Sequence, residues 1–257
     1  MQKPYIGITG FMAREEVQSV LDIIPKDSQR LLMIGVLASQ KTLIGVTNKY
    51  PNRYPHRNQI AHIFPMPHLN PSALNLVHYN TKDPTTLLAQ MKEVTEVGGP
   101  NFKGFQLNMA WPPVETLLKY RYWCPWGTKI VLQVGSHAFE VAGRHSPDLL
   151  AKQVHEYSTM INYVLLDLSG GLGMSLDAKK LRPYLDALKS KIDSDIGIGV
   201  AGGLSPTTLH LIEPLLEDFP DLCIDAEGRL RDKDDNLDLN LAGDYVRQAL
   251  SMFGRKA

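Results

Sequence analysis

Cysteine, net charge and long apolar runs are what this chain has least of. Its 257 residues include two cysteines, Cys124 and Cys223, whose separation fits no metal-ligand spacing. The low cysteine content predicts a reducing compartment, and the spacing of the two cysteines predicts no metal site. The 27 basic side chains equal the 27 acidic ones, so no overall charge attracts nucleic acid or an anionic lipid surface.

No apolar run approaches the roughly 20 residues that cross a bilayer, which predicts no membrane partner. The opening MQKPYIGITG begins at once with a strand-like run and has no signal-peptide hydrophobic region. We therefore expect a cytoplasmic protein. The chain length and a 44% hydrophobic content suit a continuous core, and we expect one domain over residues 1–257.

What the sequence does contain is eight short apolar runs, each followed by a segment that can carry a helical stripe. Most are apolar on both faces, as strands of a parallel sheet covered on both sides should be. They begin at Tyr5, Leu31, Leu74, Gly104, Lys129, Tyr163, Ile196 and Leu222. Eight strand and helix units in this length favour an α/β fold of one (β/α)8 barrel over a doubly wound open sheet.

The segments between the runs carry two further signals. Capping residues predict helices that open at Ser146 with Pro147, at Asp177, and at Ser205 with Pro206. Residues 42–71, between the second and third strands, are instead rich in Pro, Asn and His. We expect a long functional loop there, with one helix at most, and not a linker between domains.

The most informative stretch is LLDLSGGLGMSLD, residues 165–177, in which an apolar strand delivers Asp167 into a loop containing Gly171 and Gly173. Barrels of this kind handle ligands at the carboxyl ends of their strands. Asp167 is therefore a candidate catalytic carboxyl. The alternative is that it only accepts hydrogen bonds from backbone N–H groups of its own loop.

A second glycine-rich turn follows the seventh run. Gly202, Gly203 and Ser205 stand just before the expected Pro206 helix, where backbone N–H groups and a helix amino terminus would hold a phosphate. The alternative is that these glycines only form a tight turn and bind no ligand. GIGVAG matches a dinucleotide-binding pattern in letters only, because its glycines lie inside a strand. We expect no cofactor.

Four motifs together resemble phosphoribosylanthranilate isomerase of tryptophan biosynthesis. They are GITG in the first run, QLN in the fourth, LLD with GGLGMSLD in the sixth, and VAGGLSP in the seventh. The resemblance implies a barrel enzyme, monomeric or homodimeric, that binds a small phosphorylated metabolite. Its reaction is an Amadori rearrangement of a ribosylamine to a 1-amino-2-ketose. By the same resemblance Asp167 is the general acid, and Arg53, in YPNRYP, contacts the substrate. The equal alternative for Arg53 is an arginine exposed on a loop.

The chain departs from that family at two points. Thr9 stands where the family has a cysteine base, and an unassisted alcohol hardly ionises. If the chemistry survives, His78, Asp225 or Glu227 could supply the base, although for His78 alone an ordinary core or surface histidine is the favoured interpretation.

After the eighth strand, the family's Ser-Ser-Gly is replaced by Ala226, Glu227 and Gly228. A carboxylate there would repel phosphate unless Arg229 or Arg231 compensates.

Two functions therefore remain open. The first is a sugar-phosphate isomerase of the phosphoribosylanthranilate isomerase type. The second is a diverged barrel that binds a small anionic metabolite without turnover, and Thr9 and Glu227 motivate it. A different isomerase or lyase on the same barrel is a further alternative, because fold does not fix function.

Overall fold

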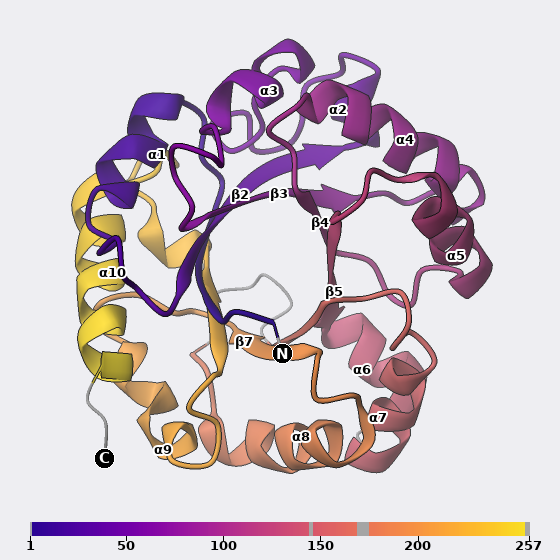
Figure 1. Cartoon of the computed structure of the whole chain (residues 1–257), viewed down its shortest axis with the longest axis vertical. Coiled ribbons are helices and arrows are strands. Elements are labelled where there is room, and N and C mark those ends of the chain that lie inside the picture. Colours follow the sequence, from indigo (N-terminus) through magenta and orange to yellow (C-terminus); the bar gives the residue numbers. More distant parts are fainter. Residues whose placement is uncertain (1, 144–145, 169–174, 255–257) are drawn as a thin grey trace.

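The computed structural model describes residues 2–143, 146–168 and 175–254. Within these residues eight parallel strands close into a barrel, in which each strand pairs with the next and the last pairs with the first (Figure 1). The strands are β1 Tyr5–Thr9, β2 Leu31–Ser39, β3 Ala73–Asn80, β4 Gly104–Leu107, β5 Lys129–Gly135, β6 Tyr163–Asp167, β7 Gly197–Ala201 and β8 Cys223–Ala226. Each coincides with one predicted run, so the predicted (β/α)8 barrel is confirmed.

Helices surround the barrel as a ring (Figure 1). The longer ones are α1 Arg14–Leu21, α4 Leu87–Gly98, α5 Val114–Trp123, α6 Ser136–Gly143, α7 Pro147–His155, α8 Ala178–Lys191 and α10 Leu239–Gly254. Shorter helical segments are α2 Gln40–Leu43, η1 Arg57–Gln59, α3 Ile60–Ile63, η2 Pro84–Thr86, η3 Leu209–Ile212, α9 Glu213–Leu216 and η4 Gly228–Leu230. The connection between β2 and β3 thus contains three short helical segments, α2, η1 and α3, where at most one helix was expected.

Two of the three predicted helix starts are confirmed. The Ser146 side chain accepts a hydrogen bond from the Leu149 N–H at 3.4 Å, and Asp177 caps α8. The prediction of a helix from Pro206 is wrong, because the chain makes a turn there and helical residues begin at Leu209. The local reason is that Thr208 donates its hydroxyl hydrogen to the Gly203 carbonyl at 2.7 Å, which favours a turn over a helix.

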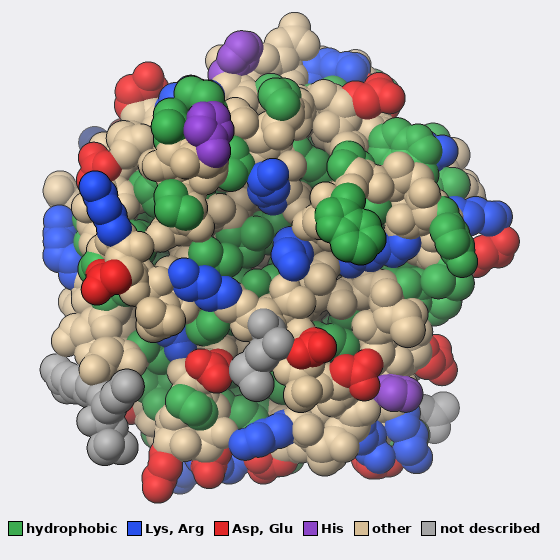
Figure 2. Space-filling model, viewed as in Figure 1, with side chains coloured by type: hydrophobic (Ala, Val, Ile, Leu, Met, Phe, Trp, Pro, Cys, Tyr) green, Lys and Arg blue, Asp and Glu red, His purple; other side chains and the backbone are tan. Residues whose placement is uncertain are grey.

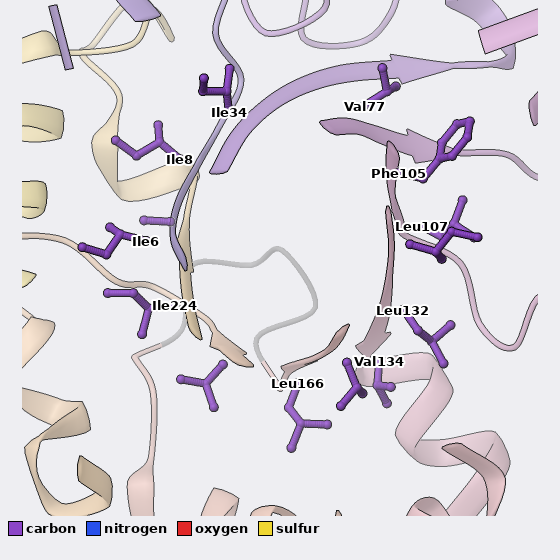
Figure 3. Close-up of a cluster of buried hydrophobic side chains, with 14 of the residues drawn as sticks. Ile6, Ile8, Ile34, Val77, Phe105, Leu107, Leu132, Val134, Leu166 and Ile224 are labelled. Carbon is purple, nitrogen blue, oxygen red and sulfur yellow. The ribbon is translucent and has the colours of Figure 1, made fainter. Parts of the chain in front are cut away.

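The main hydrophobic core lies between the barrel and its helices. Alternate strand residues such as Ile8, Leu132 and Leu166 point away from the barrel axis toward the helices (Figure 3). Each such side chain, fully buried, stabilises the fold by roughly 1.5–3 kcal/mol relative to exposure. A second cluster fills the barrel interior and consists of Tyr5, Met33, Leu74, Leu76, Val131, Tyr163, Leu165, Ala201 and Cys223.

The amino-terminal segment covers the end of the barrel where the strands begin, near the centre of the view in Figure 1. The Tyr163 hydroxyl donates to the Lys3 carbonyl at 2.8 Å, and Lys129 donates to the Gln2 side chain at 2.9 Å. On this side of the molecule both signs of charge are scattered over the surface (Figure 2). Among the described residues, no helix is both long enough and apolar enough to span a membrane.

Candidate active site

A polar layer occupies the interior at the other end of the barrel. Strand side chains alternate between the two faces, so the residue two positions after an interior apolar residue also points inward. Four such pairs occur: Leu76 with His78, Val131 with Gln133, Leu165 with Asp167, and Cys223 with Asp225. The polar members of the layer are each at most 7% exposed and are Thr9, His78, Gln106, Gln133, Asp167 and Asp225.

A chain of hydrogen bonds links the two carboxyl groups of this layer. The Gln106 amide nitrogen donates to Asp225 Oδ2 at 3.0 Å and to Gln133 Oε1 at 3.1 Å. The Gln133 amide nitrogen in turn donates to Asp167 Oδ2 at 3.1 Å. The Thr9 hydroxyl donates to Asp225 Oδ1 at 3.3 Å. Asp167 and Asp225 are therefore fixed relative to one another by the barrel wall.

Two glycines make room for this arrangement. A Cβ atom on Gly7 would lie 2.7 Å from Asp225 Oδ1, and one on Gly35 would lie 2.4 Å from the Thr9 hydroxyl oxygen. Both distances are too short for a side chain to be accommodated without movement of the carboxyl or the hydroxyl. The close approach of polar-layer side chains therefore explains why β1 and β2 have glycine at these two positions.

Burial raises the pKa of Asp225 to about 7, because the charged carboxylate loses its hydration. The hydrogen bond from Gln106 lowers that pKa in part, and the neighbouring carboxylates Glu227 and Asp167 raise it further. Burial also lowers the pKa of His78, although Glu227, 4.0 Å from its Nδ1, opposes the shift. Neither ring nitrogen of His78 has a hydrogen-bond partner among the described residues.

An ion cluster closes one side of the site. Arg53, from the connection between β2 and β3, contacts Glu227 through Nη1 at 2.9 Å and Asp235 through Nη2 at 2.5 Å. Its Nε also lies 2.9 Å from both oxygens of Asp235. The hydrogen bonds to Asp235 raise the pKa of Arg53. All three guanidinium nitrogens are thus engaged by carboxylates.

Two cavities meet at the polar layer. The smaller, of about 80 Å³, is lined by Arg53, His78, Gln133, Asp167, Ala201, Gly202, Gly203, Leu204, Asp225, Ala226, Glu227, Gly228 and Arg229. The larger, of about 280 Å³, lies beside the ends of β3, β4 and β5. Both are lined by His78, Gln133, Asp167 and Glu227. A single ligand could therefore extend from one cavity to the other past Asp167.

The structure brings most of the sequence-predicted residues to the smaller cavity. Asp167, Arg53, His78 and Glu227 line it, and Thr9 lies behind Asp225, to which it donates. Of the residues expected to bind phosphate, the lining includes Gly202, Gly203, Gly228 and Arg229.

One residue of the expected phosphate site lies elsewhere, and two others are not described. The buried Ser205 hydroxyl is hydrogen-bonded to the hydroxyls of Thr207 and Thr208, at 3.1 and 3.0 Å, and Ser205 is not among the described residues lining the cavity. Gly171 and Gly173 lie outside the described residues.

An arginine balances the negative charge of the Glu227 carboxylate. Arg53 forms the ion pair with it, whereas Arg231 donates to the carbonyl groups of Thr9 and Gly10 at 2.8 and 3.0 Å. Arg229 lines the cavity and donates to the Ser175 hydroxyl at 3.2 Å. A cation is therefore present on the glycine side of the site.

Sequence reasoning missed Gln106, Gln133 and Asp235. The two glutamines carried a usable signal, since each is a polar residue at an inward position of a buried strand. Asp235 carried none that we recognise. It lies in the turn after β8, has a φ of 67°, and meets Arg53 across 182 residues of sequence.

Asp225 should make the stability of the fold fall as pH rises. Its pKa is about 7 in the fold against 3.8 ordinarily, so the folded state binds more protons than the unfolded state between these values. The stabilisation is complete below about pH 4 and is lost as pH rises through about 7, by roughly 4 kcal/mol. We expect urea denaturation from pH 4.5 to 8 to show this slope, and the Asp225→Asn variant to lack it.

The difference between the two proteins isolates Asp225, because other titrating groups such as His78 act in both. Equal slopes in the wild type and the variant would contradict the assignment.

The fold and the polar layer place the chain in the class of (β/α)8 barrels that present a candidate ligand site at the carboxyl ends of their strands. The particular barrels it resembles include phosphoribosylanthranilate isomerases, as the sequence motifs predicted. The crystal structure of the Thermotoga maritima enzyme has a TM-score of 0.63 and 15% identity, covering 96% of this chain and 99% of that one.

A phosphoribosylanthranilate isomerase in complex with reduced 1-(o-carboxyphenylamino)-1-deoxyribulose 5-phosphate has a TM-score of 0.62 and 13% identity, covering 96% of this chain and 99% of that one. The catalytic domain of a chitinase from Pyrococcus furiosus has a TM-score of 0.55 and 9% identity, covering 100% and 98%. No family model and no curated protein sequence matches the chain. At these identities the likeness establishes the fold, which different chemistries share.

Proposed function

We propose that this protein is an aldose–ketose isomerase that rearranges a small phosphorylated ribosylamine by general acid–base catalysis. The observation that carries the proposal is the pair of buried carboxyls, Asp167 and Asp225, which line one cavity and are linked through Gln106 and Gln133. The ligand of one resembling isomerase, an aminodeoxyribulose phosphate, supports this substrate class.

In the proposed reaction Asp167 donates a proton to the ring oxygen as the C1–O bond breaks, which leaves an iminium at C1. Asp225 then takes the proton from C2, and the electron pair forms the C1–C2 double bond of an enamine that tautomerises to the ketone. A base with a pKa near the working pH is the efficient choice. The pKa of about 7 gives Asp225 that property at neutral pH.

The other candidate bases are less suited to the C2 proton. Glu227 is held in an ion pair with Arg53 at 2.9 Å. Burial lowers the pKa of His78, so the neutral imidazole is better fitted to hydrogen-bond a substrate hydroxyl than to carry a proton. Thr9 then has a supporting role, because its hydroxyl hydrogen bond favours the charged form of Asp225.

The phosphate would lie in the smaller cavity, beside Gly202, Gly203 and Arg229. The two glycines have φ values of 121° and 59°, a region that favours glycine, and such turns can direct backbone N–H groups at an anion. Arg229 supplies a positive charge on the same side. These groups would anchor the ligand and leave its ribosyl carbons beside the carboxyls.

The proposal is tested by incubating purified protein with a panel of N-substituted ribosylamine 5-phosphates and following formation of the 1-amino-2-ketose. We expect turnover of at least one member, and turnover at least about 10²-fold slower by the Asp167→Asn, Asp225→Asn double variant purified in parallel. The control matters because a contaminating isomerase would act in both preparations.

A second candidate is a barrel that binds a small anion without turnover, which the threonine at position 9 and the carboxylate at position 227 favour. It predicts that phosphate or a ribosylamine phosphate raises the melting temperature while no panel member is converted. That combination of results would replace the isomerase proposal.

A further inference from the structure

The larger cavity differs in chemistry from the smaller one. Its polar lining beyond the shared wall consists of Asn80, Asn108, Ser136 and His137. The amide and hydroxyl groups among these are uncharged hydrogen-bonding groups. The cavity is about 280 Å³, large enough for a ring-sized substituent, whereas the smaller one is about 80 Å³. A substrate with its phosphate beside Gly203 would place its amine substituent here.

No lysine or arginine is among the described residues that line the larger cavity. Its two acidic residues are Asp167, which holds a proton as the proposed general acid, and Glu227, which is paired with Arg53 at 2.9 Å. Arg53 lines the smaller cavity and has its guanidinium nitrogens committed to Glu227 and Asp235. A negatively charged substituent would therefore lose its hydration in this cavity without a lysine or arginine among the described lining residues to pair with it.

A neutral polar substituent could instead form hydrogen bonds with His78. His78 is only 4% exposed, lines both cavities, and has no hydrogen-bond partner for either ring nitrogen within the described residues. A neutral imidazole offers one donor and one acceptor. A buried polar group without a partner carries a desolvation cost that a matching ligand group removes.

We propose that the larger cavity takes an uncharged hydrogen-bonding substituent, such as a carboxamide or a hydroxylated group, and rejects an aryl carboxylate. This inference rests on the proposed function, because it assumes that the ligand is a ribosylamine phosphate. It narrows the substrate class to ribosylamine 5-phosphates whose amine substituent is polar and neutral. Anthranilate, an aryl carboxylate, would then not be the substituent.

The test is calorimetric binding of two matched compounds to the full-length protein. One is reduced 1-(o-carboxyphenylamino)-1-deoxyribulose 5-phosphate, and the other carries a carboxamide in place of the carboxylate. The compounds differ in one group and in one charge. We expect the carboxamide to bind roughly tenfold more tightly or better, since the acid has to bury a charge with no lysine or arginine among the described lining residues.

A charge variant identifies the cavity responsible. Asn108→Lys adds a cation to the lining and should raise the affinity for the carboxylate by roughly tenfold while changing that for the carboxamide less. Ser194→Lys adds the same charge to an exposed residue before β7, at the opposite end of the barrel, and should change neither affinity.

Equal binding of the two compounds, or tighter binding of the acid to the wild type, would overturn this inference and leave the isomerase proposal standing. An equal gain for the acid in Ser194→Lys would also overturn it, because the effect would then reflect overall charge. Failure of both compounds to bind would overturn the isomerase proposal together with the inference.

Discussion

Replacing Asp225 with asparagine should lower kcat by about 10²- to 10⁴-fold, because the amide cannot accept the C2 proton. The side chain keeps its size, so the hydrogen bond from the Thr9 hydroxyl can persist. The rate of the wild type should rise through about pH 7 as Asp225 ionises, and the residual rate of the variant should lack that rise. Steady-state kinetics between pH 5 and 9 on a ribosylamine 5-phosphate measure both effects.

The matched control is Asp193→Asn, an exposed aspartate before β7 at the opposite end of the barrel. It should leave both kcat and the pH profile unchanged. A kcat for Asp225→Asn close to that of this control would show that Asp225 is a structural carboxyl and that the base is elsewhere.

Asp167→Asn should also lower turnover by about 10²- to 10⁴-fold, because the ring oxygen then leaves without a proton donor. Binding of the reduced ketose analogue, measured by calorimetry, should change little, since that compound has no ring to open. The loss should therefore fall on kcat and not on KM.

The double variant adds a sharper test. When two groups act in one reaction as a unit, removing the second costs far less than removing the first. We expect the double variant to be only slightly slower than the worse single variant. Unchanged turnover in Asp167→Asn, or independent losses that multiply in full, would contradict the assignment of the two carboxyls to one reaction.

The strands were predictable because their signal is local. A run apolar on both faces is typical of a strand buried on both sides, and each such run became a strand of the barrel. The helix after Pro206 failed for an equally local reason, since the Thr208 hydroxyl bonds to the Gly203 carbonyl and supports a turn. A serine followed by a proline does not indicate whether such a competing side-chain hydrogen bond will form.

Individual residues of the site were predictable from the sequence, but the hydrogen bonds and ion pairs between them were not. Asp167 follows from its place at a strand end, whereas the link from Asp225 through Gln106 spans 119 residues and depends on barrel closure. Likewise nothing near Arg53 in sequence indicates that Asp235 engages it. Strand alternation could have placed the glutamines inside, but only three-dimensional register pairs them.

The scarcity of thiols has a practical consequence. Burial in the barrel interior raises the pKa of Cys223 to about 12, and Cys124 follows α5. Alkylating reagents and peroxides attack thiolates, and a pair of carboxyls offers them no target. The proposed chemistry should therefore persist under oxidative or electrophilic stress that inactivates an isomerase with a cysteine base.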